Sequence, residues 1–242
     1  MPERFLPGAV QRPAHADAGP VVGNLPRVVW HSTETDPATT SATTIANNLD
    51  RESFSVHLVW NPVSGAIVQA IPADRYGRGL KGLGFPTNTM GNPCIQIEVV
   101  GFAAHPFTDG PCTGLDPIMD WLRSFGIPDV FPSGVAGNRD RQTWQKAGHF
   151  THAVTPDNDH TDPGLIDPKR LFAAGGHPDP HVHPHPHPHP REHVVESGET
   201  LAEIARSEGI PFDQLRALNP GLFDAAHDNG NLIHPGEIVQ LS

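Results

Sequence analysis

The chain has 242 residues, 37% of them hydrophobic, and a formal net charge of −11. This length allows one large domain or two smaller ones. An acidic chain without a basic stripe is a poor partner for nucleic acid, because binding to phosphates needs basic surface. No apolar run approaches the roughly 18 residues of a membrane span, and the first residues lack the charged and then apolar order of a secretory signal. We therefore expect neither nucleic acid nor a membrane as a partner, and no export signal.

Residues 1–175 combine strand and helix patterns in one predicted unit. Four short apolar runs rich in β-branched residues predict buried strands: residues 28–30, 56–60, 66–71 and 95–100. The segment Pro62-Val-Ser-Gly65 predicts a hairpin turn between the second and the third of these strands.

Two helices are predicted in the same unit. The first covers residues 42–49. The second covers residues 115–126, where Asp116 would cap the helix, Pro117 would take the first helical position and Gly126 would end it. Strands mixed with helices favour an α/β fold, with a mixed central β-sheet covered by helices.

The two cysteines, Cys94 and Cys112, are too few for a disulfide framework or for a zinc site of cysteines. We expect two free, partly buried thiols. Residues 176–192 then form a tract dominated by proline and histidine, in which proline at alternate positions favours extended backbone. This pattern predicts a semi-rigid linker. A histidine-rich tract can also bind metal, which is the alternative for this segment.

Residues 193–242 form a second predicted domain, with the order β-α-α-β. A strand covers residues 193–196, and the turn 197–200 caps a helix at 201–208, which Gly209 ends. A second helix covers residues 211–218. The turn 232–236 leads into the last strand, residues 237–241.

His152 and Asp162 are the first candidates for a functional site. Neutral imidazole and carboxylate are both good zinc ligands, and a catalytic zinc usually takes three protein ligands and leaves a position for water. His31 is the best third candidate because it ends the apolar run of residues 28–30 and begins a polar turn, so that a buried strand would hold it rigidly.

These residues also carry a resemblance to a known family. The segments Val28-Val-Trp-His31, Ser55–Trp60 with Gln69, Ile95-Gln-Ile-Glu98 and Thr151-His152 through Asp162-Pro-Gly164 resemble the zinc-dependent N-acetylmuramoyl-L-alanine amidases of the type-2 class, which share a fold with the peptidoglycan recognition proteins. The resemblance covers roughly residues 20–172. It implies that Zn²⁺ is held by His31, His152 and Asp162.

The second ligand needs a choice between two histidines. The family usually places it in a Gly-His pair, and this chain has Gly148-His149. The family's usual spacing to the aspartate before Pro-Gly fits His152, which lies ten positions before Asp162, whereas His149 lies thirteen before it. We therefore predict His152, with Thr151 in place of the usual glycine.

The resemblance also implies the catalytic residues. Glu98 lies in an otherwise apolar strand, where an unpaired carboxylate is costly, and the family uses a glutamate here as a general base. A salt bridge to Arg75 or Arg78 is the structural alternative. His160 stands where several relatives have a lysine that stabilises the transition state, and a histidine could donate a hydrogen bond to the oxyanion there.

Several other side chains are predicted to be structural. His57 is expected to be a buried histidine with its hydrogen bonds satisfied rather than a fourth ligand, and His105 is expected on the surface. Trp60, Trp121 and Trp144 are assigned to the core or to a groove wall without preference.

The second domain resembles a LysM module, which binds glycans that contain N-acetylglucosamine. The segments Ser197–Ala205, Asn219-Pro220 and Leu232–Glu237 carry this resemblance. Its expected glycan-binding residues are Ser197, Gly198, Glu199, Thr200, Ile233, His234, Pro235 and Gly236.

Together the two resemblances imply hydrolysis of the amide between N-acetylmuramic acid and L-alanine in bacterial peptidoglycan, by a monomer. A wall-degrading enzyme without an export signal resembles a bacteriophage endolysin, made in the host cytoplasm and released at lysis. The alternatives are a bacterial autolysin and a non-catalytic peptidoglycan-binding protein of the same fold. A sugar-cleaving hydrolase is disfavoured because Glu98 has no evident carboxylate partner.

Overall fold

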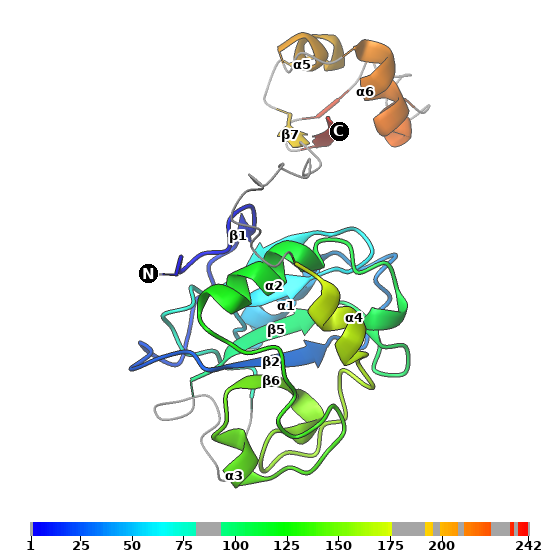
Figure 1. The fold of residues 1–242 in the computed structure, drawn as a ribbon. Coiled ribbons are helices and arrows are strands. Elements are labelled where there is room, and N and C mark those ends of the chain that lie inside the picture. Colours follow the sequence, from blue (N-terminus) through cyan, green and yellow to red (C-terminus); the bar gives the residue numbers. More distant parts are fainter. Residues whose placement is uncertain are drawn as a thin grey trace, which may run out of the picture. The chain divides into compact units, whose positions relative to one another are not determined.

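The computed structural model describes residues 2–80, 93–175, 192–195, 199–207, 211–223, 233–234 and 237–241 (Figure 1). The chain divides into two compact units, Met1–Asp179 and Pro180–Ser242. The division falls inside the tract that we predict to be a linker, whose residues 176–191 lie outside the described part. Each unit has a hydrophobic core of its own.

A mixed sheet forms the centre of the first unit, as predicted. Its six strands in the described part of the chain have the order β1-β4-β3-β5-β2-β6. Their bounds are β1 Val10–Gln11, β2 Arg27–Ser32, β3 Leu58–Trp60, β4 Ile67–Gln69, β5 Ile95–Val99 and β6 Gly148–Thr151. Strands β3 and β4 are antiparallel, as the predicted hairpin requires, and the other neighbours are parallel.

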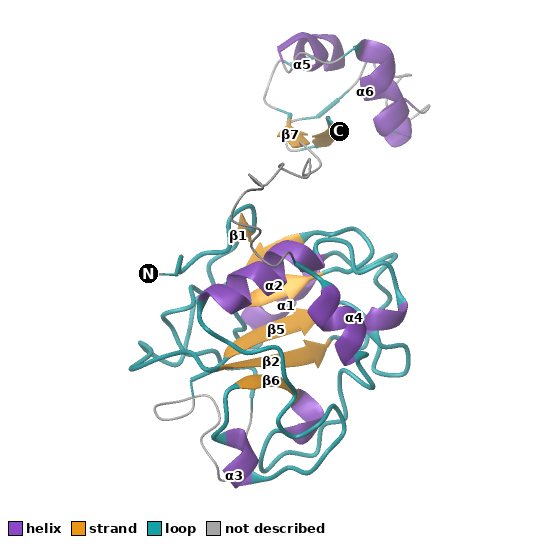
Figure 2. Cartoon of the chain, viewed as in Figure 1, coloured by secondary structure: helices purple, strands orange, loops and turns teal. Residues whose placement is uncertain are grey.

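Helices cover both faces of this sheet (Figure 2). One face packs against α2 (Leu115–Ser124) and α4 (Pro168–Ala173), and these elements share one large hydrophobic cluster. The opposite face packs against α1 (Ala42–Arg51). The apolar residues of α1 contact the side chains of β3 and β4 that point to this face. The short α3 (Arg141–Trp144) packs beside β6 through the buried Trp144. The central sheet is therefore covered on both faces.

Side-chain alternation assigns the residues of each strand to one of the two faces. In β5, Ile95, Ile97 and Val99 belong to the cluster that contains α2. Glu98 therefore points to the opposite face, the one that α1 partly covers. The same alternation in β2 sends Val28 and Trp30 to the α2 face and sends His31 to the face of Glu98.

The N-terminal segment is fastened to the sheet. Strand β1 pairs with β4 at one edge. The backbone amide of Leu6 donates to Oε1 of Gln69 (2.7 Å), and Nε1 of Trp121 on α2 donates to the carbonyl of Glu3 (2.8 Å). These bonds connect the first residues to both the edge of the sheet and the helix that covers it.

The predicted start of α2 is wrong. The helix begins at Leu115 after Gly114, whose φ of +80° suits glycine. Asp116 lies inside the first turn, and its carboxylate accepts from the backbone amide of Gly175 (2.8 Å) instead of capping α2. The predicted end is confirmed, since Gly126 follows the helix with a φ of +75°.

The second unit has the predicted order β-α-α-β. Its elements are β7 (Glu192–Val194), α5 (Leu201–Ser207), α6 (Phe212–Leu218) and β8 (Ile238–Gln240), with β7 antiparallel to β8. Thr200 and Glu203 form a reciprocal cap at the start of α5: Oγ1 of Thr200 accepts from the amide of Glu203, and the Glu203 carboxylate accepts from the amide of Thr200.

The remaining expectations about the core are met, except for the burial of Cys94. Cys94 and Cys112 form no disulfide within the described residues; Cys112 is partly buried as expected, whereas Cys94 is fully buried. Trp60, Trp121 and Trp144 are all buried in the core, and His105 is exposed. None of the helices within the described ranges has both the length and the apolar character that crossing a membrane requires.

Candidate metal centre

Two neighbouring strands place His31 and Glu98 side by side. His31 is paired with Glu98 in the register of the parallel strands β2 and β5, and both side chains point to the face opposite α2. The strand β2 continues through Ser32, so His31 lies inside the strand and not at its end as the sequence suggested. Backbone hydrogen bonds on both sides of β2 therefore fix this half of the site.

The chain that leaves β6 brings the other candidates to the same place. Strand β6 is parallel to β2, with Thr151 paired to Trp30, so the residue after Thr151 arrives beside His31. That residue, His152, begins a 3-10 turn (His152–Val154). The chain then makes a loop and returns with Asp162, whose carbonyl accepts from the amide of Ala153 (3.0 Å).

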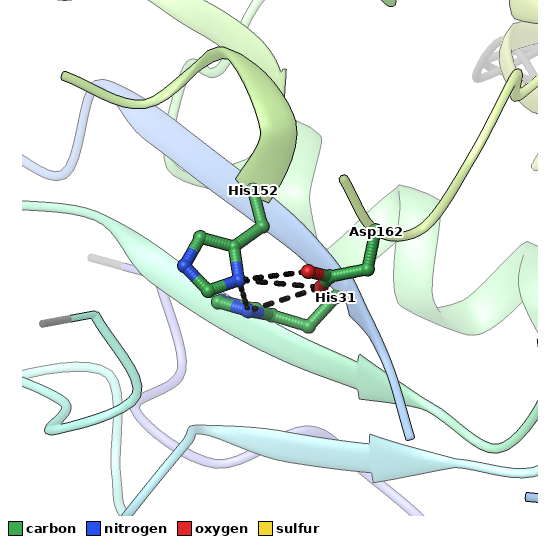
Figure 3. Close-up of side chains that lie close together, drawn as sticks. All are labelled: His31, His152 and Asp162. Carbon is green, nitrogen blue, oxygen red and sulfur yellow. Dashed lines mark hydrogen bonds and ion pairs between the residues drawn. The ribbon is translucent and has the colours of Figure 1, made fainter. Parts of the chain in front are cut away.

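Three ligand atoms converge in this region (Figure 3). Nδ1 of His31 lies 3.0 Å from Nδ1 of His152 and 3.8 Å from Oδ2 of Asp162. Nδ1 of His152 lies 3.1 Å from Oδ1 of Asp162. In a tetrahedral zinc site with bonds of about 2.0–2.1 Å, neighbouring ligand atoms lie about 3.3 Å apart. The observed separations bracket that value, so the donor set fits a metal ion of this kind.

The ionisation of His31 and Asp162 also suits a metal. Burial, with the nearby charge of His152, lowers the pKa of His31 to about 3. Burial alone would raise the pKa of Asp162, but the hydrogen bond with His152, the nearby His31 and the backbone amide of Ser32 lower it to about 2. His31 is therefore neutral and Asp162 ionised near neutral pH, the states in which these groups bind a metal.

The cluster opens into a cavity of about 550 Å³. Carboxylates of Glu34, Glu98, Asp159 and Asp162 line the cavity, and Leu49 and Phe54 provide an apolar wall. Burial, together with the charges of Asp162 and Glu34, raises the pKa of Glu98 to about 8. A carboxyl group with this pKa can accept and release a proton near neutral pH.

The alternative partner of Glu98 is engaged elsewhere. Arg75 donates from Nε and Nη2 to the two carboxylate oxygens of Asp17, at 2.9 and 2.8 Å. No ion pair joins Glu98 to an arginine within the described residues. The carboxylate therefore belongs to the cavity.

His160 lies at the edge of the cluster. Its ring stacks on the ring of His152, with centroids 3.9 Å apart, and its Nδ1 lies 3.3 Å from Oδ1 of Asp162. About half of the side chain is exposed. Because Nδ1 faces Asp162, Nε2 is the ring nitrogen left for a substrate, and it can donate only when both ring nitrogens carry a proton.

The other two histidines near these strands are structural. His149 is paired with Val28 in β6 and points to the α2 face, where its Nδ1 accepts from Nε1 of Trp30 (3.0 Å). His57 accepts at Nδ1 from the amide of Gln96 and donates from Nε2 to the carbonyl of Arg75, both at 2.9 Å. The prediction of a hydrogen-bonded core histidine at position 57 is confirmed. His149 lies on the wrong face of the sheet to join His31.

Two residues that sequence reasoning did not single out support the loop between His152 and Asp162. The buried Asn158 donates from Nδ2 to the carbonyl of His152 (3.1 Å) and accepts at Oδ1 from the amide of His160 (2.7 Å). Arg139 donates to the carbonyls of Ala153 and His160. These contacts join side chains to backbone atoms across the loop, and no pattern in the sequence predicts them.

Half of the predicted glycan-binding residues lie outside the described part of the chain, namely Ser197, Gly198, Pro235 and Gly236. Of the others, Glu199 pairs with Nε2 of His193 (2.7 Å), and Thr200 caps α5. Ile233 packs against the core of the second unit, whereas His234 is exposed.

Comparisons with known proteins find similar solved structures and one matching domain family. Solved structures similar to the chain include "Staphylococcus aureus hydrolase AmiA in complex with its ligand" (18% identity, 65% of this chain and 73% of that one, TM-score 0.43) and an AmpD derivative (19%, 72% and 97%, 0.45). Another is the "Endolysine N-acetylmuramoyl-L-alanine amidase LysCS" from Clostridium intestinale (14%, 70% and 96%, 0.42). Among curated protein sequences, none matches this chain. Residues 193–242 match the LysM domain family, and this part of the chain is a LysM domain.

Proposed function

We propose that the chain is a zinc-dependent N-acetylmuramoyl-L-alanine amidase, which hydrolyses the amide between N-acetylmuramic acid and L-alanine in peptidoglycan. One observation carries the proposal: His31, His152 and Asp162 converge in a cavity that Glu98 also lines. Two imidazoles and a carboxylate form the three-ligand set of a catalytic zinc. The LysM domain at residues 193–242 supports peptidoglycan as the substrate.

The residues of the cavity supply a hydrolytic mechanism. When bound by the three ligands, zinc supplies Lewis-acid chemistry to water and to the amide carbonyl. Glu98 takes the proton of the attacking water and returns it to the departing amine of L-alanine. Its raised pKa suits both steps, since the carboxyl group has to hold the proton and then give it up.

His160 completes the proposed site. Its ring is held by stacking on His152 and by Asp162, and a doubly protonated ring would donate from Nε2 to the developing oxyanion. Leu49 and Phe54 on the apolar wall would exclude water from the part of the cavity that the substrate fills.

The LysM domain gives the proposal its biological setting. A domain that holds N-acetylglucosamine-containing glycan would keep the catalytic unit near its substrate, which raises the local concentration without changing the chemical step. A hydrolase site joined to such a domain suits an enzyme that lyses bacterial cells, as an endolysin does. A bacterial autolysin is the alternative.

Product analysis tests the reaction directly. Purified wall incubated with the protein is expected to release new L-alanine amino termini without new reducing sugar ends. New reducing ends without amino termini would contradict the amidase proposal. Binding without either product would favour a non-catalytic peptidoglycan-binding protein.

A truncated chain separates binding from catalysis. Removal of residues 193–242 is expected to weaken retention on insoluble wall while cleavage of small soluble muropeptides continues, because the proposed catalytic groups all lie in the first unit. Unchanged retention would contradict the assigned role of the LysM domain.

A further inference from the structure

We propose that Arg139 is a positioning residue that fixes the separation of His152 and Asp162 by holding both ends of the loop between them. This inference rests on the proposed metal site. The hydrogen bonds of Arg139 go to backbone carbonyls near the proposed ligands, and not to the ligand side chains themselves.

The contacts of Arg139 define the role. Its Nε donates to the carbonyl of Ala153 (2.8 Å), and its Nη2 donates to the carbonyl of His160 (2.7 Å). Ala153 directly follows His152, and His160 comes two residues before Asp162. Because the guanidinium group is planar and its donors are fixed relative to one another, these two bonds set the distance between the outgoing and returning chains.

A backbone bond strengthens the same junction. The amide of Ala153 donates to the carbonyl of Asp162 (3.0 Å), while its carbonyl accepts from Arg139. Both polar groups of Ala153 are thereby fixed, one to Asp162 and the other to Arg139. Loss of the arginine would leave the returning chain with one of these two connections.

Arg139 is itself placed by a fixed element. The carboxylate of Asp140, the next residue, caps α3 by accepting from the amides of Gln142 and Thr143. At the other end of α3, the fully buried Trp144 packs in one cluster with Phe150 and Val154. The start of α3 is therefore attached to the core beside β6, and Arg139 reaches the loop from this support.

Arg141 offers a matched control in the same segment. It is also exposed and forms an ion pair with Asp157, at the tip of the loop, where φ is +54°. Removing either arginine changes the net charge by the same amount. Arg139 donates to carbonyls on both the outgoing and the returning chain next to the proposed ligands.

The experiment measures zinc affinity in the full chain by competition with a chromophoric chelator, for the wild type, R139A, R139K and R141A. R139A is expected to bind zinc about tenfold more weakly, the lower end of the range for residues that orient metal ligands. R139K should recover little of this loss, because one ammonium group does not provide two donors in a fixed plane. R141A should retain the affinity of the wild type.

The visible absorption of the cobalt-substituted protein provides a second readout, since it reports the geometry of the ligands. Its bands are expected to change in R139A and R139K and to stay unchanged in R141A. Equal affinity and equal spectra of R139A and the wild type would overturn the positioning role alone. An equal loss in R141A would also overturn it. A wild-type chain that binds no zinc would instead overturn the proposed function.

Discussion

The two halves of the candidate site are held in place by different means. His31 and Glu98 lie on neighbouring parallel strands, where the register of β2 and β5 sets their positions. His152 and Asp162 lie at the two ends of a loop, and side chains hold that loop: Asn158 from within and Arg139 from outside. The strand half is therefore as rigid as the sheet. The loop half depends on a few polar side chains, so substitutions of supporting residues should disturb the loop half more than the strand half.

The largest effect is expected from removing a ligand of the loop half. His152→Ala should lower zinc affinity by more than about 100-fold, beyond the range for residues that only orient ligands, and abolish hydrolysis. Zinc content of the purified protein and release of L-alanine amino termini measure the two effects. His149→Ala is the control from the opposite face of the sheet, and zinc bound per folded molecule should stay the same. If His149→Ala lost zinc and His152→Ala kept it, the choice of ligand would be wrong.

A substitution of Glu98 in the strand half should reduce catalysis without reducing metal binding. Glu98→Gln keeps the shape of the side chain but cannot take a proton, so the rate of hydrolysis should fall by about 10²–10⁴. Zinc affinity should change little, because Glu98 is not one of the converging ligands. The measurements are the turnover of a soluble muropeptide and a zinc titration. An unchanged turnover number would exclude Glu98 as the general base.

A smaller effect is expected from the interior of the loop. Asn158→Ala removes the hydrogen bonds to the backbone of His152 and His160. Because the loop then holds His152 and Asp162 less firmly, zinc binding should weaken by about tenfold. A matched substitution outside the loop half is Asn61→Ala, directly after β3, which removes a buried amide that bonds to the carbonyls of Pro37 and Thr40. That variant should lose stability and keep its zinc affinity. Equal zinc affinities in the two variants would contradict the dependence of the loop half on Asn158.

The smallest effect concerns the pH dependence of stability through His57, which precedes β3 in the central sheet. Burial lowers the pKa of His57 to about 4, whereas an unfolded histidine has a pKa of about 6.5. As pH falls from 6.5 to 4, His57 therefore binds a proton in the unfolded state but not in the folded state. The free energy of unfolding falls by up to about 1.4 kcal/mol per pH unit for this group. In the metal-free protein, the free energy of unfolding, measured with urea, should fall less steeply with decreasing pH over that range in His57→Gln than in the wild type. Identical slopes would mean that His57 does not titrate differently in the two states.

The parts of the fold that could be predicted were those with a strong local signal. Runs such as residues 95–100 are rich in β-branched residues and became strands, and Gly126 ends α2 with a positive φ. Strand β6, Gly148–Thr151, was not predicted because its four residues include glycine and histidine and show no apolar run. Helix α4 is not among the predicted elements, although Asp167, which caps it, and Pro168 at its first position form a recognisable signal.

The site followed the same division. His152 and Asp162 were candidates by residue type, the family's spacing favoured His152 over His149, and the structure brings the pair together with His31. His149 lies on the α2 face because side chains alternate along β6. Its face can be assigned only once the pairing of β6 with β2 is known. Asn158 and Arg139 bond to backbone carbonyls of residues that are not their neighbours in the sequence, and such contacts depend on the folded path of the chain.

The attachment of the first residues to β4 has a further consequence for handling the protein. An open sheet edge presents unpaired backbone groups to other molecules and invites aggregation. Strand β1, with the bonds of Leu6 to Gln69 and of Glu3 to Trp121, shields that edge. A shortened variant that begins after Gln11 would uncover it and remove the buried Leu6 from the core, so poor solubility of such a variant would not by itself indicate damage to the metal centre.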